Sequence, residues 1–206
     1  MLEAYAPDSQ RYPLNCLADE YKQTYLDPSF QRRGGMENGS GWSEKQAQFY
    51  VGSFLGGLTC NIIVRAHVLE CLKWAREQGD KKSEEYFLAK KDEGWEFISI
   101  DGHNTSSALY WFVRMNMFML DPKTKMEKQL KDYNKFDQND ILYKEKILVV
   151  TLWRISYPQM CHLFRHLNMN EALNKQEHRQ AMPTELSAFI RDIANLGGKQ
   201  HVLQSV

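Results

Sequence analysis

The residues best suited to chemistry stand together between Asp101 and Ser106, in the run Asp-Gly-His-Asn-Thr-Ser. His103 is the side chain of this run whose ordinary pKa lies near neutrality, so it can accept or donate a proton at physiological pH. Asp101 can orient that imidazole, bind Mg²⁺ through its carboxylate, or cap the turn. A turn histidine beside a capping aspartate explains the same residues, so the sequence leaves these roles open.

A strand, a glycine turn and a helix are predicted around these residues. Large apolar residues largely alternate with polar ones over 95–100, which indicates a short buried strand. Gly102 breaks the run, and the apolar spacing from Ala108 to Met115 predicts a helix. Its candidate N-caps are Thr105, Ser106 and Ser107. Backbone N–H groups left unpaired at such a point favour an anion such as phosphate, although an ordinary strand-to-helix connection has the same pattern.

The composition is that of a globular protein with one main core. The chain has 206 residues, of which 43% are apolar and 25% charged. Its 26 Lys and Arg balance 26 Asp and Glu, so any DNA contact requires a local basic patch. There is no apolar run of transmembrane length and no signal-peptide pattern. We therefore expect a cytoplasmic protein with no membrane partner.

The cysteines and histidines do not follow a metal-binding pattern. The four cysteines are scattered without a close pair, which predicts reduced, buried thiols rather than a zinc site. His162 and His166 have the i,i+4 spacing that can bind metal on a helix, but no H-E-x-x-H motif surrounds them. Packing and surface roles are favoured for both.

Local patterns predict the remaining elements. Helices are expected after Pro13, from Ser43 to Gly56, over 66–78, from Ser156 and within 174–196, with Ser43 and Ser156 as caps of the helices that they begin. Strands are expected over 60–64, 117–120 and 147–153, the last of them central because it is β-branched and apolar. Residues 1–12 are expected to be irregular, 81–93 a charged excursion, and 121–140 an exposed loop or marginal helix. A glycine-rich loop over 34–41 is expected to close over a ligand.

This order predicts an α+β fold, with a small mixed-sheet core, helical insertions and a helical C-terminal extension. The core is assigned to residues 1–155. The extension is assigned to residues 156–206, packed on the core, with the chain continuing into a further C-terminal domain as an open alternative.

Four segments in collinear order carry a family resemblance. They are Phe30-Gln31-Arg32 with Trp42, Gln48–Val64, Ser99–Leu109, and Leu163–Asn168 followed by Leu173, Asn174, Gln176, Glu177, Arg179 and Ala181. The third resembles both I-D-G-Q-Q-R-x-x-A-L and D-G-H-x-R, and the fourth resembles I-F-x-R-L-N … L-N-x-Q-E-x-R-x-A. Together they resemble the ParB/sulfiredoxin-like superfamily, especially the branch at the N-terminus of GmrSD-type modification-dependent restriction enzymes and related phage or defence proteins.

The resemblance implies a ParB/sulfiredoxin-like core that binds a nucleoside triphosphate of unspecified identity, with Mg²⁺, and acts on DNA. The implied catalytic residues are Asp101, His103 and Arg32, with Asp101 also the metal ligand. The implied cofactor-binding residues are Gln31, Gly102, Asn104, Thr105, Ser106, Asn168, Gln176, Glu177 and Arg179. Helix capping by Asn174 and a surface Glu177–Arg179 face explain the C-terminal group equally well.

One departure bears on activity. The family arginine falls on Thr105, so Arg32, Arg33 or Arg179 must supply its charge, or the fold binds without turnover. The leading hypothesis is an NTP-dependent, DNA-processing protein, an NTP hydrolase or nicking endonuclease in restriction or phage–host conflict. The second is a catalytically reduced module that binds DNA or a protein partner. The third is metal-dependent DNA cleavage by Asp101 and His103, which no further carboxylate cluster supports.

Overall fold

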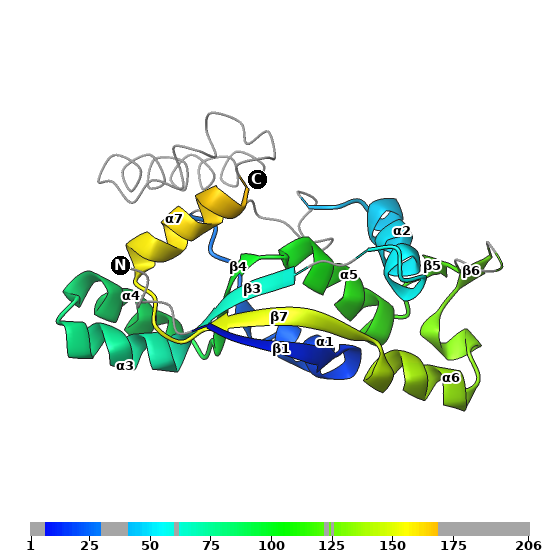
Figure 1. The fold of residues 1–206 in the computed structure, drawn as a ribbon, viewed down its shortest axis with the longest axis horizontal. Coiled ribbons are helices and arrows are strands. Elements are labelled where there is room, and N and C mark those ends of the chain that lie inside the picture. Colours follow the sequence, from blue (N-terminus) through cyan, green and yellow to red (C-terminus); the bar gives the residue numbers. More distant parts are fainter. Residues whose placement is uncertain (1–6, 30–40, 60–61, 122–123, 125, 169–206) are drawn as a thin grey trace, which may run out of the picture.

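The computed structural model describes residues 7–29, 41–59, 62–121, 124 and 126–168. Its main sheet has five strands: β1 (Pro7–Pro13), β2 (Thr24–Tyr25), β3 (Ile62–His67), β4 (Phe97–Asp101) and β7 (Lys146–Leu152). Their order is β1-β7-β3-β4-β2, and Figure 1 shows β7 between β1 and β3. β7 is antiparallel to β1 and parallel to β3, whereas β4 is antiparallel to β3 and parallel to β2. The predicted α+β class and mixed sheet are confirmed, as is the internal position of β7.

Helices make up most of the remaining described chain. They are α1 (Leu14–Tyr21), α2 (Glu44–Leu55), α3 (Val68–Gln78), α4 (Lys81–Asp92), α5 (His103–Arg114), α6 (Lys135–Asn139) and α7 (Tyr157–Leu167). A small hairpin of β5 (Met119–Leu120) and β6 (Glu127–Lys128) follows α5. A 3₁₀ turn over Leu130–Asp132 and a π turn over Asp140–Lys144 complete this stretch.

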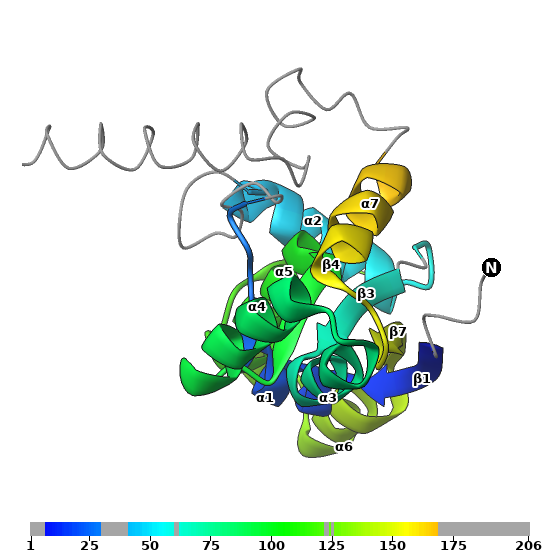
Figure 2. The same ribbon diagram turned by 90° about the vertical axis from the view of Figure 1, so that its left-hand side faces the viewer.

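The two faces of the sheet carry separate apolar clusters, because successive side chains of a strand point to opposite faces. Ile63 belongs to the cluster with α1, α2 and α5, and the next residue, Val64, to the cluster with α3, α4 and α7. In both ribbon views α1 and α7 lie on opposite sides of the sheet (Figure 2). The layers are therefore helices, sheet, helices.

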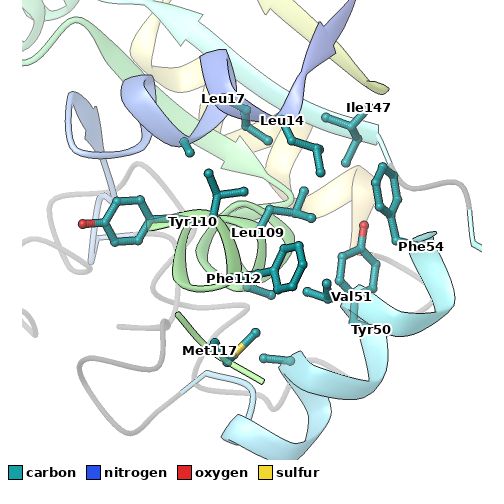
Figure 3. Close-up of a cluster of buried hydrophobic side chains, with 14 of the residues drawn as sticks. Leu14, Leu17, Tyr50, Val51, Phe54, Leu109, Tyr110, Phe112, Met117 and Ile147 are labelled. Carbon is teal, nitrogen blue, oxygen red and sulfur yellow. The ribbon is translucent and has the colours of Figure 1, made fainter. Parts of the chain in front are cut away.

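The helix α5 is held between α1 and α2 (Figure 3). Leu109 and Phe112 are 0% exposed and meet Leu14 from α1 and Val51 from α2, which are also 0% exposed. A helix with apolar partners on two sides has little freedom to tilt. Since the Asp101–Ser106 run begins this helix, its position is fixed by the core.

Two capping predictions are confirmed. Ser43 and Ser156 each form a capping box at the start of α2 and α7, with Gln46 and Gln159 as the reciprocal partners. Met160 of α7 is completely buried in one of the two apolar clusters, so this helix packs against the sheet. Residues 169–206, including the helices expected over 174–196, lie outside the described residues, and the division at 155 stays a prediction.

Two predictions of irregular structure are wrong. Residues 7–12, expected to be irregular, form β1 together with Pro13, an edge strand that pairs along its whole length with β7. Pro7 and Pro13 stand at its ends, where proline is tolerated. Residues 81–92, expected to be a charged excursion, form α4, which Asp80 caps and which buries Phe87 completely. Both elements are stabilised by contacts with distant parts of the chain, which the local sequence pattern does not display.

The cap of α3 makes stability depend on pH. The Nδ1 atom of His67 accepts the backbone N–H of Glu70 at 3.4 Å, and its ring stacks on Trp153. Burial lowers the pKa of His67 from its ordinary 6.5, although Glu96 and Glu70 oppose the shift. Protonation of His67 therefore favours the unfolded chain. The contribution of the neutral side chain to the free energy of unfolding should be fully present above pH 6.5 and be lost as pH falls through the folded-state pKa.

Urea unfolding at several pH values checks this prediction. His67→Asn keeps a capping acceptor that does not titrate near neutrality. The stability of the parent should fall relative to His67→Asn between about pH 7 and pH 5. Parallel pH profiles for the two proteins would contradict it.

Candidate functional site

The Asp101–Ser106 run consists of the last residue of β4, the turn residue Gly102 and the first four residues of α5. Gly102 occupies the N-cap position of α5 with φ 80°, and its N–H donates to Oδ1 of Asp101 at 2.7 Å. The expectation that Thr105, Ser106 or Ser107 caps the helix is wrong, since all three lie inside it. The helix begins earlier because a left-handed glycine already turns the chain, and the Ser106 hydroxyl donates back to the carbonyl of Gly102 at 3.0 Å.

The turn is pressed closely against the neighbouring strand. A Cβ added at Gly102 would lie 3.0 Å from Cα of Ile63 and 3.1 Å from the carbonyl oxygen of Ile62. A side chain would also be strained at the positive φ of this residue. Glycine is therefore required here by both space and conformation, and β3 fixes the direction in which α5 starts.

The side chains of the first turn have distinct surroundings. The His103 ring stacks on Tyr21 with centroids 5.9 Å apart, and Tyr21 stacks in turn on Tyr110 at 4.7 Å. Asn104 accepts the backbone N–H of Trp42 through Oδ1 at 3.4 Å, which ties the start of α2 to the start of α5. Thr105 is only 2% exposed, so its hydroxyl is not presented to solvent. The N-cap residue, Gly102, has no side chain that could cap the helix.

A buried arginine lies beneath the turn, and sequence reasoning missed it. Arg65 is 2% exposed; its Nε donates to Oγ1 of Thr151 at 3.2 Å and its Nη1 to Glu20 at 2.6 Å. Its guanidinium lies 3.7 Å from the centre of the Phe97 ring. Nη2 has no hydrogen-bond partner in the described part of the chain. The available signal was a single charge inside the apolar run of β3.

The arginine and the turn share a small cavity. Its volume is about 10 Å³, and Arg65, Ser99, His103 and Ser106 contribute to its walls. A space of this size admits one water molecule and no phosphate group. Direct contact between Arg65 and a phosphate at the turn is therefore excluded, and only its charge or a bridging water would reach one.

Most of the other predicted site residues lie outside the described part of the chain. Gln31, Arg32, Gln176, Glu177 and Arg179 lie outside the described residues, and so do Arg33 and Asn174. Asn168 is described: it ends α7, and its side-chain amide donates to the carbonyl of Phe164 at 2.8 Å. That contact is a helix-capping role.

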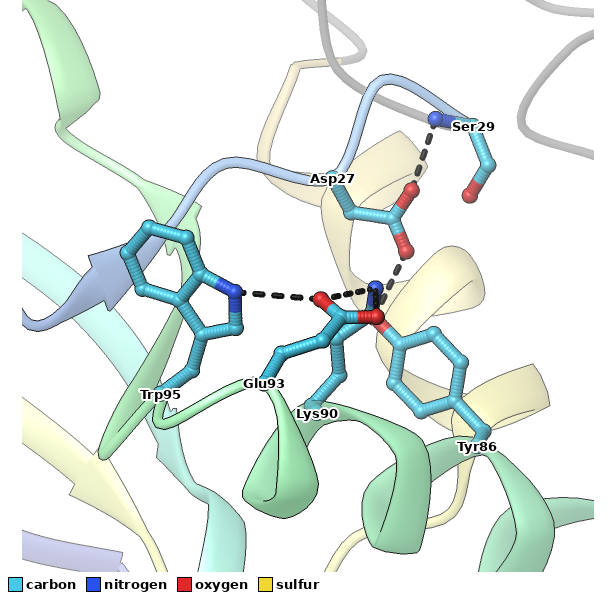
Figure 4. Close-up of polar contacts among 6 residues, drawn as sticks. All are labelled: Asp27, Ser29, Tyr86, Lys90, Glu93 and Trp95. Atoms are coloured by element: carbon cyan, nitrogen blue, oxygen red, sulfur yellow. Dashed lines mark hydrogen bonds and ion pairs between the residues drawn. The ribbon is translucent and has the colours of Figure 1, made fainter.

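A second polar cluster anchors the chain just before residue 30 (Figure 4). Asp27 is 4% exposed and accepts the Tyr86 hydroxyl at 2.6 Å and the backbone N–H of Ser29 at 2.7 Å. Burial, with the Asp27 charge beside it, holds the pKa of Tyr86 well above its ordinary value, so the phenol keeps its proton. The hydroxyl of Ser29 lies 2.9 Å from that of Tyr157. These contacts fix the position of residues 27–29 on the core.

The described residues do not form a metal-binding cluster. No three His, Cys, Asp or Glu side chains within them gather closely enough to hold a metal ion. His162 and His166 pack edge to face with ring centroids 4.2 Å apart. A Mg²⁺ ion at Asp101 would need phosphate oxygens and water as its remaining ligands, which is the usual arrangement for this ion.

None of the helices in the described ranges is both long and apolar enough to span a bilayer.

Comparison with known proteins leaves the family open. No family model, curated protein or solved structure matches the chain.

Proposed function

We propose that this chain binds a nucleotide through its phosphates at the start of α5, as a ParB-like module acting on DNA. The observation that carries the proposal is the turn itself: the 12-residue helix α5 begins on a left-handed glycine with no side-chain cap, directly over the buried Arg65. Helix N-termini attract anions through their N–H groups and dipole. The link to DNA rests on the family resemblance.

The geometry favours binding over hydrolysis. Thr105, at the position of the family arginine, is buried, and Arg65, which shares a cavity with the turn, is paired with Glu20 and shielded from solvent. Oδ1 of Asp101 accepts the Gly102 N–H, which is a turn-stabilising role. A binding module without turnover, coupled to DNA or to a protein partner, is therefore the form of the proposal that the site supports best. Phosphate release from a panel of nucleoside triphosphates, compared with Asp101→Asn, separates it from a hydrolase.

A charge placed in the first turn tests the phosphate site. Asn104→Asp keeps the Oδ1 acceptor that Trp42 uses and adds a negative charge where the phosphate should bind. We expect it to weaken pyrophosphate and nucleotide binding by at least tenfold in calorimetry. The protein should stay as stable or become about 0.5 kcal/mol more stable, because an acid favours a helix N-terminus.

The matched control is Asn134→Asp, which makes the same change of charge at the N-cap of α6 and keeps the cap to Asp137. It should bind these ligands as the parent does. Equal affinities for Asn104→Asp and Asn134→Asp would contradict the proposal that phosphate binds at the start of α5.

A further inference from the structure

The stretch from Met115 to Leu120, which leads from α5 into β5, presents apolar side chains to solvent. Met117 and Met119 are buried in the core. Phe118 and Leu120 alternate with them and are 42% and 36% exposed, because successive side chains of an extended chain point to opposite sides. Met115 is 49% exposed. The outward side of this stretch is therefore as apolar as its inward side.

The helix α2 extends this apolar surface. Phe49, which is 65% exposed, and Gly52 stand one turn apart on one side of α2. Gly52 adjoins β5, since a Cβ added to it would meet the carbonyl oxygen of Leu120. Phe49 therefore lies beside the outward side of the Met115–Leu120 stretch. Single exposed apolar residues are common, but neighbouring ones mark an interaction surface. We name the exposed side chains of Phe49, Met115, Phe118 and Leu120 the α2–β5 patch.

A hollow of about 570 Å³ adjoins the patch, between the start of α2 and the end of α5. Its walls include Trp42, Trp111 and Glu44, together with two members of the patch, Met115 and Phe118. The hollow has room for a large aromatic side chain. The same surface therefore carries a concave apolar site and, in Phe49, an exposed ring that could fill one.

The size and charge of this surface fit a second copy of the chain. The patch exposes about 400 Å², since a large apolar side chain has an accessible area of about 200 Å². One side of a standard protein interface covers about 800 Å², of which a little over half is apolar. The patch therefore supplies most of the apolar area that a stable dimer needs. The chain has no net charge, so two copies do not repel each other at long range.

The charges beside the patch are complementary to one another. Lys45 is exposed and stands one turn before Phe49 on the same side of α2. Glu44 lines the hollow. If Phe49 of one copy enters the hollow of the other, Lys45 comes close to Glu44 of the partner subunit. In a two-fold dimer each contact is made twice, so a self-complementary surface of this kind is what such a dimer requires.

We infer that two copies of this chain associate through the α2–β5 patch, with Phe49 of each copy in the hollow of the other. Lys45 of each copy pairs with Glu44 of the partner subunit at the edge of the interface. The inference is independent of the proposed phosphate site at the start of α5.

Sedimentation velocity on the full chain over a range of concentrations tests the inference. The parent should sediment as a dimer that dissociates on dilution. Phe49→Asp should raise the dimer dissociation constant at least tenfold, because it places a charge at the centre of an apolar interface. Phe136→Asp is the matched control, since Phe136 of α6 is 70% exposed and belongs to neither the patch nor the hollow. It should leave the dissociation constant unchanged.

A charge exchange tests the two-fold arrangement itself. Glu44→Lys should weaken the dimer at least threefold, because Lys45 of the partner subunit then meets a lysine. Adding Lys45→Glu to the same chain should restore the parent affinity, because both pairs are then reversed. If the double variant is weaker than Glu44→Lys alone, the arrangement is overturned.

Two further outcomes overturn the inference. A parent that stays monomeric up to about 100 µM has no dimer of useful affinity, and its patch is then left for a different protein. A dimer that Phe49→Asp and Phe136→Asp weaken equally, or that neither weakens, has its interface elsewhere on the chain. Circular dichroism checks that each variant keeps the helical content of the parent.

Discussion

Gly52→Ala is expected to lower the free energy of unfolding by about 3 kcal/mol, because a backbone atom blocks the added methyl group. A Cβ at Gly52 would lie 2.2 Å from the carbonyl oxygen of Leu120, at the contact between α2 and β5. The obstacle is backbone, so no side-chain rotation relieves it. Alanine is otherwise the better helix former by about 1 kcal/mol, so a net loss can only come from the contact. Urea unfolding with linear extrapolation measures the change.

Gly79→Ala provides the control for glycine replacement in open space. Gly79 has φ 67° and nothing within 4 Å of an added Cβ, so its replacement costs only the left-handed conformation, about 1–2 kcal/mol. Gly52→Ala should cost more. A Gly52→Ala protein as stable as its parent would show that α2 and β5 can separate freely.

Glu20→Gln is expected to be the second large change, lowering the free energy of unfolding by about 3 kcal/mol. Arg65, 2% exposed, would keep its charge with no carboxylate beside it. Arg65→Met should cost less, because Glu20, whose side chain is 26% exposed, can return to water. The double variant should lose less than the sum of the two, since one interaction is counted in both.

The exposed pair Lys144–Asp140 is the matched control for this cycle. Its atoms are 2.8 Å apart, but the side chains are 68% and 37% exposed. Asp140→Asn should therefore change stability by at most about 0.5 kcal/mol. Glu20→Gln and Asp140→Asn with equal small effects would mean that solvent reaches the guanidinium of Arg65.

Features governed by short-range chemistry could be predicted from the sequence. Ser43 and Ser156 are predicted caps because each is a serine directly before a helical apolar pattern, and both cap their helices in the structure. The run 147–153 was assigned to an internal strand because only a strand covered on both faces is apolar nearly throughout. The turn at Gly102 could also be predicted from the local sequence, because this glycine interrupts the alternation of apolar and polar residues.

Features made by distant partners could not be predicted. β1 has no apolar alternation and is a strand because β7 pairs with it. Arg65 meets Glu20 45 residues away and Thr151 86 residues away, so no local pattern connects the three. Trp42 and Trp111 line one hollow of about 570 Å³ although they lie far apart in the sequence, so no local pattern connects them.

The strand order has a consequence for how the chain folds as it is synthesised. β7 (146–152) lies between β1 (7–13) and β3 (62–67), so the first strand has no neighbour in the sheet until the last strand has been made. At the usual pace of translation that delay is on the order of ten seconds. Meanwhile β3 presents an open edge with apolar residues, the kind of surface that pairs with other chains. Nascent chains that stall before residue 146 should therefore be aggregation-prone and should depend on chaperones.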